Sequence, residues 1–254
     1  MQIIQSPAKL MNFNGLKEEK EPTKPLFPGR TKELVTLCQQ LSEKEIAGLM
    51  KINPKMARDV YEQFQTFYFK NTPKRSAALA YNGIAYSGLN ACDFTEGDHH
   101  FAQQQLNILS ALYGLLRPFD EIRPYRLELQ LHIAPQGYST LYQFWQDTVN
   151  ATLTKKLRKE KEKTIINVAS NEYAKVMQKS KLPRGTRIVD IRFLQQENND
   201  FKQIIVHTKK ARGLLSRFII KNRLTDVEDV KGFDDEGYFF YPSLSKENDW
   251  LFVR

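Results

Sequence analysis

The chain has 254 residues, which suffices for one or two domains with a buried core. Hydrophobic residues make up 41% and charged residues 26%, so a disordered chain, a collagen and a simple coiled coil are excluded. Lys and Arg total 38 against 29 Asp and Glu, giving a net charge of +9. This excess favours an anionic partner such as nucleic acid, nucleotide phosphates or acidic lipid, the alternative being a basic protein with solvated charges.

No stretch approaches the roughly 18 apolar residues that a membrane-spanning helix needs. The first residues, 1–7, lack the basic and apolar regions of a signal peptide. The two cysteines, Cys38 and Cys92, form no CxxC motif, and free thiols are favoured over a bridge between them. We therefore expect a cytoplasmic protein with no membrane partner.

Hydrophobic periodicity and turn residues predict the elements of the first half of the chain. Ser42 and Glu45 form a capping box, and Pro54 stands where a proline opens a helix. Three prolines within residues 17–29 favour an exposed loop there. The predicted elements are a buried strand at 2–5, a loop at 6–12, the loop at 17–29, helices at 31–41, after Ser42 and at 54–69, and a strand at 77–81.

The second half alternates between long apolar-striped segments and short strands. The predicted elements are helices at 98–116 and 138–159, a strand at 164–168, a short helix at 171–179, a hairpin of 186–195 with 201–208, a helix at 209–223, and strands at 238–241 and 250–253. No linker divides the chain. We predict one compact, mixed α+β domain over residues 1–254, with a sheet surrounded by helices.

Residues 49–57, LMKINPKMA, are similar to a helix-hairpin-helix turn, which is typically L-P-G-I-G-P-K-x-A. That turn aims backbone N–H groups at a DNA phosphate. Lys51 and Asn53 replace its two glycines, and Asn53 tolerates the left-handed conformation that the second glycine supplies. Lys51, Lys55 and Arg58 gather positive charge around the turn. The alternative is an ordinary helix pair whose second helix starts with proline.

The predicted helix at 209–223 has six basic residues and no acidic one. Lys209, Lys210 and Arg212 fall near its expected start, where the helix dipole has the same sign as their charge. An anion there would remove this conflict, so these three residues and Arg217 are candidate nucleic-acid ligands. The alternative is a helix whose cations flank a buried apolar seam.

Two further polar clusters stand out. Arg126 belongs to a group of three arginines, with Arg117 and Arg123, that either bind phosphate bidentately or pair internally with Asp120 and Glu128. Glu172 follows a buried strand, where open α/β sheets place their sites. Glu128 and Glu172 are weak candidates for a proton-transferring group. The histidines and cysteines lack metal-ligand spacing and no nucleotide-cofactor motif occurs, so we expect no metal and no cofactor.

Six strings, taken together, resemble the YaaA peroxide-stress family, formerly a domain of unknown function. They are SPAK at 6–9, YNG at 81–83 with YSGL at 86–89, LSALYGLLRP at 109–118, PYRLE at 124–128, NVASNEY at 167–173 and KKARG at 209–213. The likeness runs from residue 1 to about residue 240. The family often has Thr-Leu-Asp after its SPAK, where this chain has Leu10, Met11 and Asn12.

The resemblance implies a cytoplasmic bacterial protein that protects against hydrogen peroxide, by keeping unincorporated iron low and limiting damage to DNA and proteins. It also implies a compact mixed α/β fold with a positively charged cleft and a helix-hairpin-helix-like element suited to DNA. It brings no settled reaction. No peroxide chemistry follows from the residues themselves.

Two main hypotheses follow. The leading one is a DNA-binding protein of the peroxide response, bound to double-stranded or branched DNA with little sequence preference. The second is an enzyme for a phosphate-bearing or nucleic-acid substrate, in which Lys9, Arg126 and Arg212 bind the anion and Glu128 or Glu172 moves a proton. Convergence of these side chains in one pocket would favour the second hypothesis, and separate faces would exclude it. A stress-induced adaptor of other proteins is a third alternative.

Overall fold

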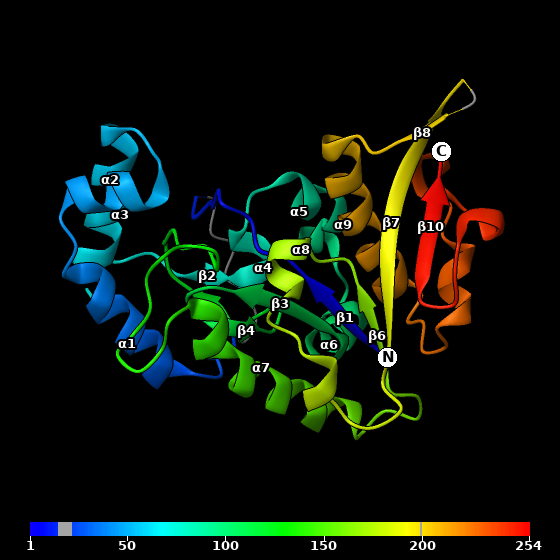
Figure 1. Ribbon diagram of the computed structural model, residues 1–254, viewed down its shortest axis with the longest axis horizontal. Helices are drawn as coiled ribbons and strands as arrows, with labels where there is room; N and C mark the ends of the chain where they lie inside the picture. The colour runs from blue at the N-terminus through cyan, green and yellow to red at the C-terminus, as the bar shows by residue number, and fades with distance from the viewer. Residues whose placement is uncertain (15–21, 199) are drawn as a thin grey trace.

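A mixed β-sheet runs through the middle of the molecule (Figure 1). The computed structural model describes residues 1–14, 22–198 and 200–254. Within them the strand order is β4-β3-β1-β6-β7-β10-β9, with β8 paired to β7, and β2 and β5 form a separate small ladder. The strands are β1 Gln2–Gln5, β2 Arg75–Ser76, β3 Leu106–Ser110, β4 Gly114–Leu116, β5 Glu121–Ile122, β6 Thr164–Asn167, β7 Arg187–Glu197, β8 Asp200–Lys202, β9 Phe239–Phe240 and β10 Asp249–Val253.

The centre of this sheet is parallel. Strands β3, β1, β6, β7 and β10 pair in parallel, and the pairs of β4, β8 and β9 are antiparallel. Every residue of β1, β3 and β6 is buried, as expected for parallel strands covered on both faces. The loops that follow β1 and β6 therefore leave the sheet side by side at its carboxyl edge.

Helices surround the sheet, and α1, α2 and α3 form one end of the molecule's long axis, opposite β7 and β10 (Figure 1). The α-helices are α1 Pro28–Gln39, α2 Glu43–Met50, α3 Pro54–Gln65, α4 Ala77–Ala80, α5 Ile84–Leu89, α6 Glu96–Gln105, α7 Leu141–Leu157, α8 Asn171–Ala174 and α9 Ile205–Lys221. Short 3-10 turns occur at Ala91–Asp93, Lys179–Lys181, Glu228–Gly232, Asp235–Gly237 and Pro242–Leu244. No helix in the parts of the chain that the structure describes is long and apolar enough to cross a membrane.

The predicted mixed α/β single domain is confirmed, and so are the strands at 2–5 and 164–168 and the Ser42–Glu45 capping box. The strand predicted at 77–81 is wrong, because residues 77–80 form α4. The helix predicted at 98–116 is wrong beyond Gln105, where β3 begins. Residues 106–116 are all buried, and a fully buried strand cannot be told from a buried helix by periodicity.

Several helices and strands begin or end at other residues than predicted. The predicted hairpin is confirmed in β7 and β8, but β8 stops at Lys202 and α9 already starts at Ile205. The helix predicted at 54–69 ends at Gln65, and the one predicted at 171–179 shrinks to α8. In the loop predicted at 17–29, residues 17–21 lie outside the described residues, and Pro28 opens α1. Cys38 and Cys92 are free.

Helices α5 and α9 cross with their backbones in close contact, because each carries a glycine at the crossing. A Cβ atom on Gly213 would collide with the carbonyl oxygen of Ala85, and one on Gly88 would come within 2.5 Å of the carbonyl oxygen of Lys210. Arg212 directly precedes Gly213. This crossing therefore fixes the position of Arg212 relative to the start of α5.

Candidate functional site

A cavity of about 450 Å³ opens where the loops after β1 and β6 leave the sheet. It brings together segments that are far apart in the sequence. The loop after β1 contributes 5–10, the start of α5 contributes 82–85, the segment 125–128 forms one wall, the loop after β6 and α8 contribute Val168, Ser170, Glu172 and Tyr173, and α9 contributes Lys209 and Arg212. The carboxyl edge of parallel strands is where α/β sheets commonly bind ligands.

Ser6 joins the two loops at the floor of the cavity. Its Oγ accepts a hydrogen bond from the backbone N–H of Ser170 at 2.8 Å, and it donates to the Ser170 Oγ at 3.3 Å. The hydroxyl of Tyr86 in α5 donates to the carbonyl oxygen of Ser6. These bonds hold the ends of β1, β6 and α5 in one arrangement.

Glu128 forms an ion-paired group with two cations. Its carboxylate lies 2.7 Å from the Lys9 Nζ and 3.4 Å from an Arg126 nitrogen. Glu128 and Arg126 are largely buried, whereas the Lys9 side chain is 57% exposed. The Arg126 Nε is buried and has no hydrogen-bond partner among the described residues. One carboxylate thus faces two cations, and this group carries one more positive than negative charge.

Arg212 is the second arginine of the cavity. Its buried Nε has no hydrogen-bond partner within the described ranges, and burial lowers the pKa of its guanidinium. A buried guanidinium without a carboxylate partner is costly, and an anionic ligand would compensate it. Lys209, four residues after the first residue of α9, also lines the cavity and is exposed.

Glu172 supplies a carboxylate whose pKa is raised above its ordinary value. Burial raises its pKa, and the negative charge of Glu128 raises it further, against the opposing effects of Lys9 and of hydrogen bonds from the backbone of Gln130 and Leu129. Its buried Oε1 has no hydrogen-bond partner in the described part of the chain. Such a group holds a proton more readily than an ordinary glutamate, which suits a hydrogen-bonding or proton-transferring role.

All the residues predicted for the anion pocket, Lys9, Arg126 and Arg212, line this one cavity, and so do Glu128, Glu172 and Lys209. The sequence interpretation did not single out Ser6, Asn82, Tyr125 or Ser170, which line it too. All four stand inside the strings that resemble the family, so those strings mark uncharged residues of the cavity that charge alone does not indicate.

The candidate nucleic-acid residues of the helix pair lie elsewhere, with Lys51 and Asn53 between α2 and α3 and Lys55 and Arg58 in α3. Both helices lie at one end of the molecule (Figure 1). The residue with the left-handed backbone in this turn is Lys51, at the first glycine position, and not Asn53. Lys51 has φ 51° and ψ 51°, while Asn53 is extended and caps α3 by accepting a hydrogen bond from the Met56 N–H at 2.9 Å. Lys51 and Lys55 are exposed, and Arg58 pairs with Glu62 at 3.2 Å.

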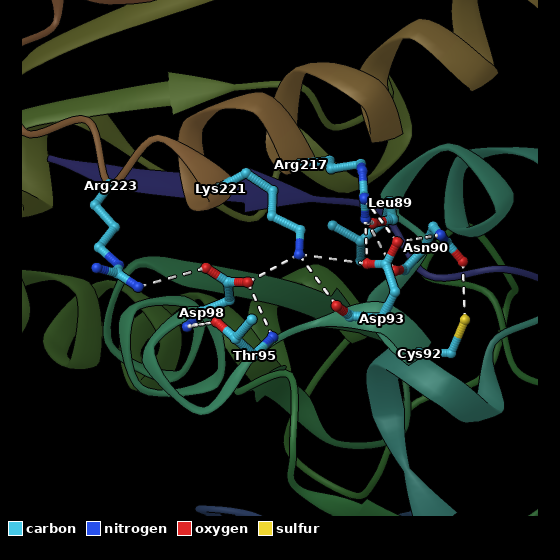
Figure 2. Close-up of polar contacts among 9 residues, drawn as sticks. All are labelled: Leu89, Asn90, Cys92, Asp93, Thr95, Asp98, Arg217, Lys221 and Arg223. Carbon is cyan, nitrogen blue, oxygen red and sulfur yellow. Dashed lines mark hydrogen bonds and ion pairs between the residues drawn. The ribbon is translucent and has the colours of Figure 1, made fainter.

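The cations of α9 divide into two groups. Lys209 and Arg212 line the cavity, whereas Lys210 pairs with Glu236. Two more cations of this ion-paired group are shown in Figure 2. Arg217 forms two 2.7 Å hydrogen bonds to the Asp93 carboxylate, and the Lys221 Nζ lies 2.9 Å from the Asp98 carboxylate. The expected start of this helix at Lys209 was also too late, since Ile205 begins α9.

Fold and cavity together define an α/β protein with a cation-bearing pocket at the carboxyl edge of its parallel strands. The family model described as peroxide stress protein YaaA matches residues 1–244. A UPF0246 protein of Francisella tularensis subsp. tularensis (strain WY96-3418) is 37% identical over 257 residues, covering 100% of both chains. The chain belongs to the YaaA peroxide-stress family, as its sequence strings indicated.

Proposed function

We propose that this protein acts in the peroxide-stress response by binding a phosphate-bearing ligand in the cavity described above. The observation that carries the proposal is the convergence of Lys9, Arg126, Lys209 and Arg212, from three distant parts of the chain, on one cavity. Neutralisation of a DNA backbone at a surface would not require buried arginines. We take this cavity to be the positively charged cleft expected for the family.

Two features support an anionic ligand in particular. The buried Nε atoms of Arg126 and Arg212 lack hydrogen-bond partners among the described residues, and guanidinium groups are strong donors to phosphate oxygens. Glu172 lines the same cavity and has a raised pKa, so the cavity offers a group able to give or take a proton. We therefore also propose that the protein catalyses a reaction of the bound ligand, with Glu172 as the group that transfers a proton.

Isothermal titration calorimetry with sulfate, inorganic phosphate and mononucleotides tests the pocket. Arg212→Ala should weaken binding about tenfold or more, because a charge-assisted hydrogen bond is worth about 1.5–3 kcal/mol. The matched control is Arg184→Ala, at an exposed arginine outside the cavity. No binding of any of these anions to the wild type, or equal affinity in the two variants, would refute the pocket.

A second candidate function, binding of DNA with little sequence preference, is favoured by α2 and α3. Lys51 and Lys55 are exposed at the turn before α3, and no ion pair of theirs is found in the described residues. Cations around a helix start are suited to a backbone phosphate. The helix pair would then act as the helix-hairpin-helix-like element, with the left-handed Lys51 at its first glycine position.

Lys51→Glu plus Lys55→Glu tests this DNA site. Wild type should bind duplex DNA with a slope of log K against log salt of about −5 if it neutralises six phosphates. Each lost phosphate contact should reduce the slope by about one, so the double variant should lose about two units. Lys159→Glu plus Lys161→Glu makes the same charge change at exposed residues near the end of α7 and should leave the slope closer to wild type.

The resemblance also leads us to propose that the protein limits damage linked to unincorporated iron. Survival of cells under hydrogen peroxide, with wild type, Arg212→Ala or the Lys51/Lys55 double variant as the only copy, shows which of the two surfaces protection needs. Full protection by both variants would show that neither the cavity nor the turn between α2 and α3 is needed for survival under peroxide.

A further inference from the structure

The cavity has apolar and hydrogen-bonding groups besides its cations, and these groups are suited to a nucleobase. Tyr125 and Tyr173 line it and are 6% and 7% exposed, so each is held rigidly by packing and presents a small part of its surface to the cavity. Val168 and Leu127 add aliphatic surface, and the unpartnered Oε1 of Glu172 is an acceptor for an N–H group. Aromatic side chains and a hydrogen-bonding carboxylate are suited to a nucleobase.

The polar atoms without partners come in two chemical kinds. Among the described residues that line the cavity, the Nε atoms of Arg126 and Arg212 and the Gln5 Nε2 are donors, and the Oε1 atoms of Glu172 and Gln5 are acceptors. An inorganic anion satisfies only the donors and would bring negative charge toward Glu172. A nucleotide satisfies both, because its phosphate accepts from the arginines while an N–H of its base donates to the carboxylate. A volume of about 450 Å³ lies in the range of pockets for ligands of this size.

The rim of the cavity carries exposed aliphatic side chains. Leu10 is 65% exposed and Ile84 is 39% exposed, and both line the opening. The carbonyl oxygen of Leu10 accepts a hydrogen bond from the Asn82 N–H at 2.9 Å, so its backbone is held firmly. Lys9 stands next to it with its cation half exposed. Proteins that unstack nucleic acids insert aliphatic side chains between bases beside cations that hold the backbone.

We infer that the cavity receives a single nucleotide extruded from a nucleic-acid strand, with Leu10 occupying the space that the extruded base leaves. This inference rests on the proposed phosphate-binding role of the cavity. The phosphate of the extruded nucleotide lies against Lys209 and Arg212, and its base lies among Tyr125, Tyr173 and Glu172. Extrusion is easiest at a mismatched or damaged base, which matches the DNA lesions that peroxide creates.

Photo-crosslinking tests this inference directly. One probe is a duplex with a single 5-iodouracil opposite guanine, and the other is free 5-iodo-2′-deoxyuridine 5′-monophosphate. Irradiation joins iodouracil to aromatic side chains in contact with it, and mass spectrometry of the peptides gives the position. With the duplex we expect the crosslink at Tyr125 or Tyr173. Leu10→Ala should lose it, and Leu244→Ala, which removes a leucine of 39% exposure elsewhere, should keep it.

The possible failures are distinguishable. If the free nucleotide crosslinks in the cavity and the bound duplex does not, the extrusion inference falls while the proposed ligand pocket stands. If neither probe reaches the two tyrosines and phosphate does not bind in calorimetry, both fall. Crosslinking of the duplex that persists in Leu10→Ala overturns the role of Leu10. Circular dichroism of each variant ensures that a lost crosslink is not a lost fold.

Discussion

Glu172 illustrates how one residue's charge state can control a whole cavity. Burial raises its pKa, the nearby Glu128 raises it further, and Lys9 acts in the opposite direction. As the pH falls through this raised pKa, Glu172 takes up a proton, and a negative charge disappears from the cavity that Arg212 also lines. Anion affinity should therefore increase toward low pH.

Glu172→Gln separates this effect from others. The amide is neutral at every pH, so sulfate should bind more tightly to Glu172→Gln than to wild type at neutral pH, with less change as the pH is lowered. Sulfate serves as the probe because its own charge does not change in this range. Calorimetry at several pH values measures the effect, and a pH profile identical to that of wild type would contradict it.

The crossing of α5 and α9 is the element-scale feature on which the cavity depends. Gly213 and Gly88 let the two backbones touch, and the cavity uses the start of α5 together with Lys209 and Arg212 of α9. A side chain at the crossing would separate the helices. Both the fold and the position of Arg212 would then change together.

Gly213→Ala should lower the free energy of unfolding by about 1–3 kcal/mol or more, because overpacking forces the backbones apart. Gly48→Ala is the matched control. Gly48 lies inside α2 with nothing within 4 Å of an added Cβ, so alanine there should raise stability by about 0.5–1 kcal/mol. Urea denaturation of both variants gives the two values, and equal effects would show that the close crossing is unimportant.

At the scale of the whole molecule, ion pairs join segments that lie far apart in the chain. Asp98 at the start of α6 binds Lys221 of α9 at 2.9 Å, and Arg217 binds Asp93 (Figure 2). Burial alone would raise the pKa of Asp98, but hydrogen bonds from Lys221 and Thr95 outweigh it and hold the pKa at about 2. The ionised form of Asp98 is thus favoured in the folded state.

Because this pKa lies below the ordinary value of 3.8, Asp98 stabilises the fold above about pH 4, and that contribution is lost as the pH falls toward 2. Asp98→Asn should be less stable than wild type at neutral pH, and the difference should shrink over this acid range. Denaturation between pH 2 and pH 7 measures it. A constant difference across the range would mean that the carboxylate charge does not contribute.

The sequence by itself determined the class of fold, several of the elements and the family. Buried strands at 2–5 and 164–168, the capping box at Ser42 and the long helix beginning near Leu141 follow from local patterns that packing did not override. It also supplied the charged residues of the cavity, since Lys9, Arg126, Glu172 and Arg212 stood in distinctive strings.

Only the tertiary structure decided which of these residues act together. Residues 106–110 and 114–116 form β3 and β4, and because they are buried on both faces, the sequence lacks the periodicity that separates strand from helix. Arg217 and Arg212 belong to the same basic helix, yet Arg217 is paired to Asp93 and Arg212 lines the cavity. Pairing depends on neighbours brought from distant segments by the sheet order and by the glycine crossing, and no local pattern in the sequence contains that information.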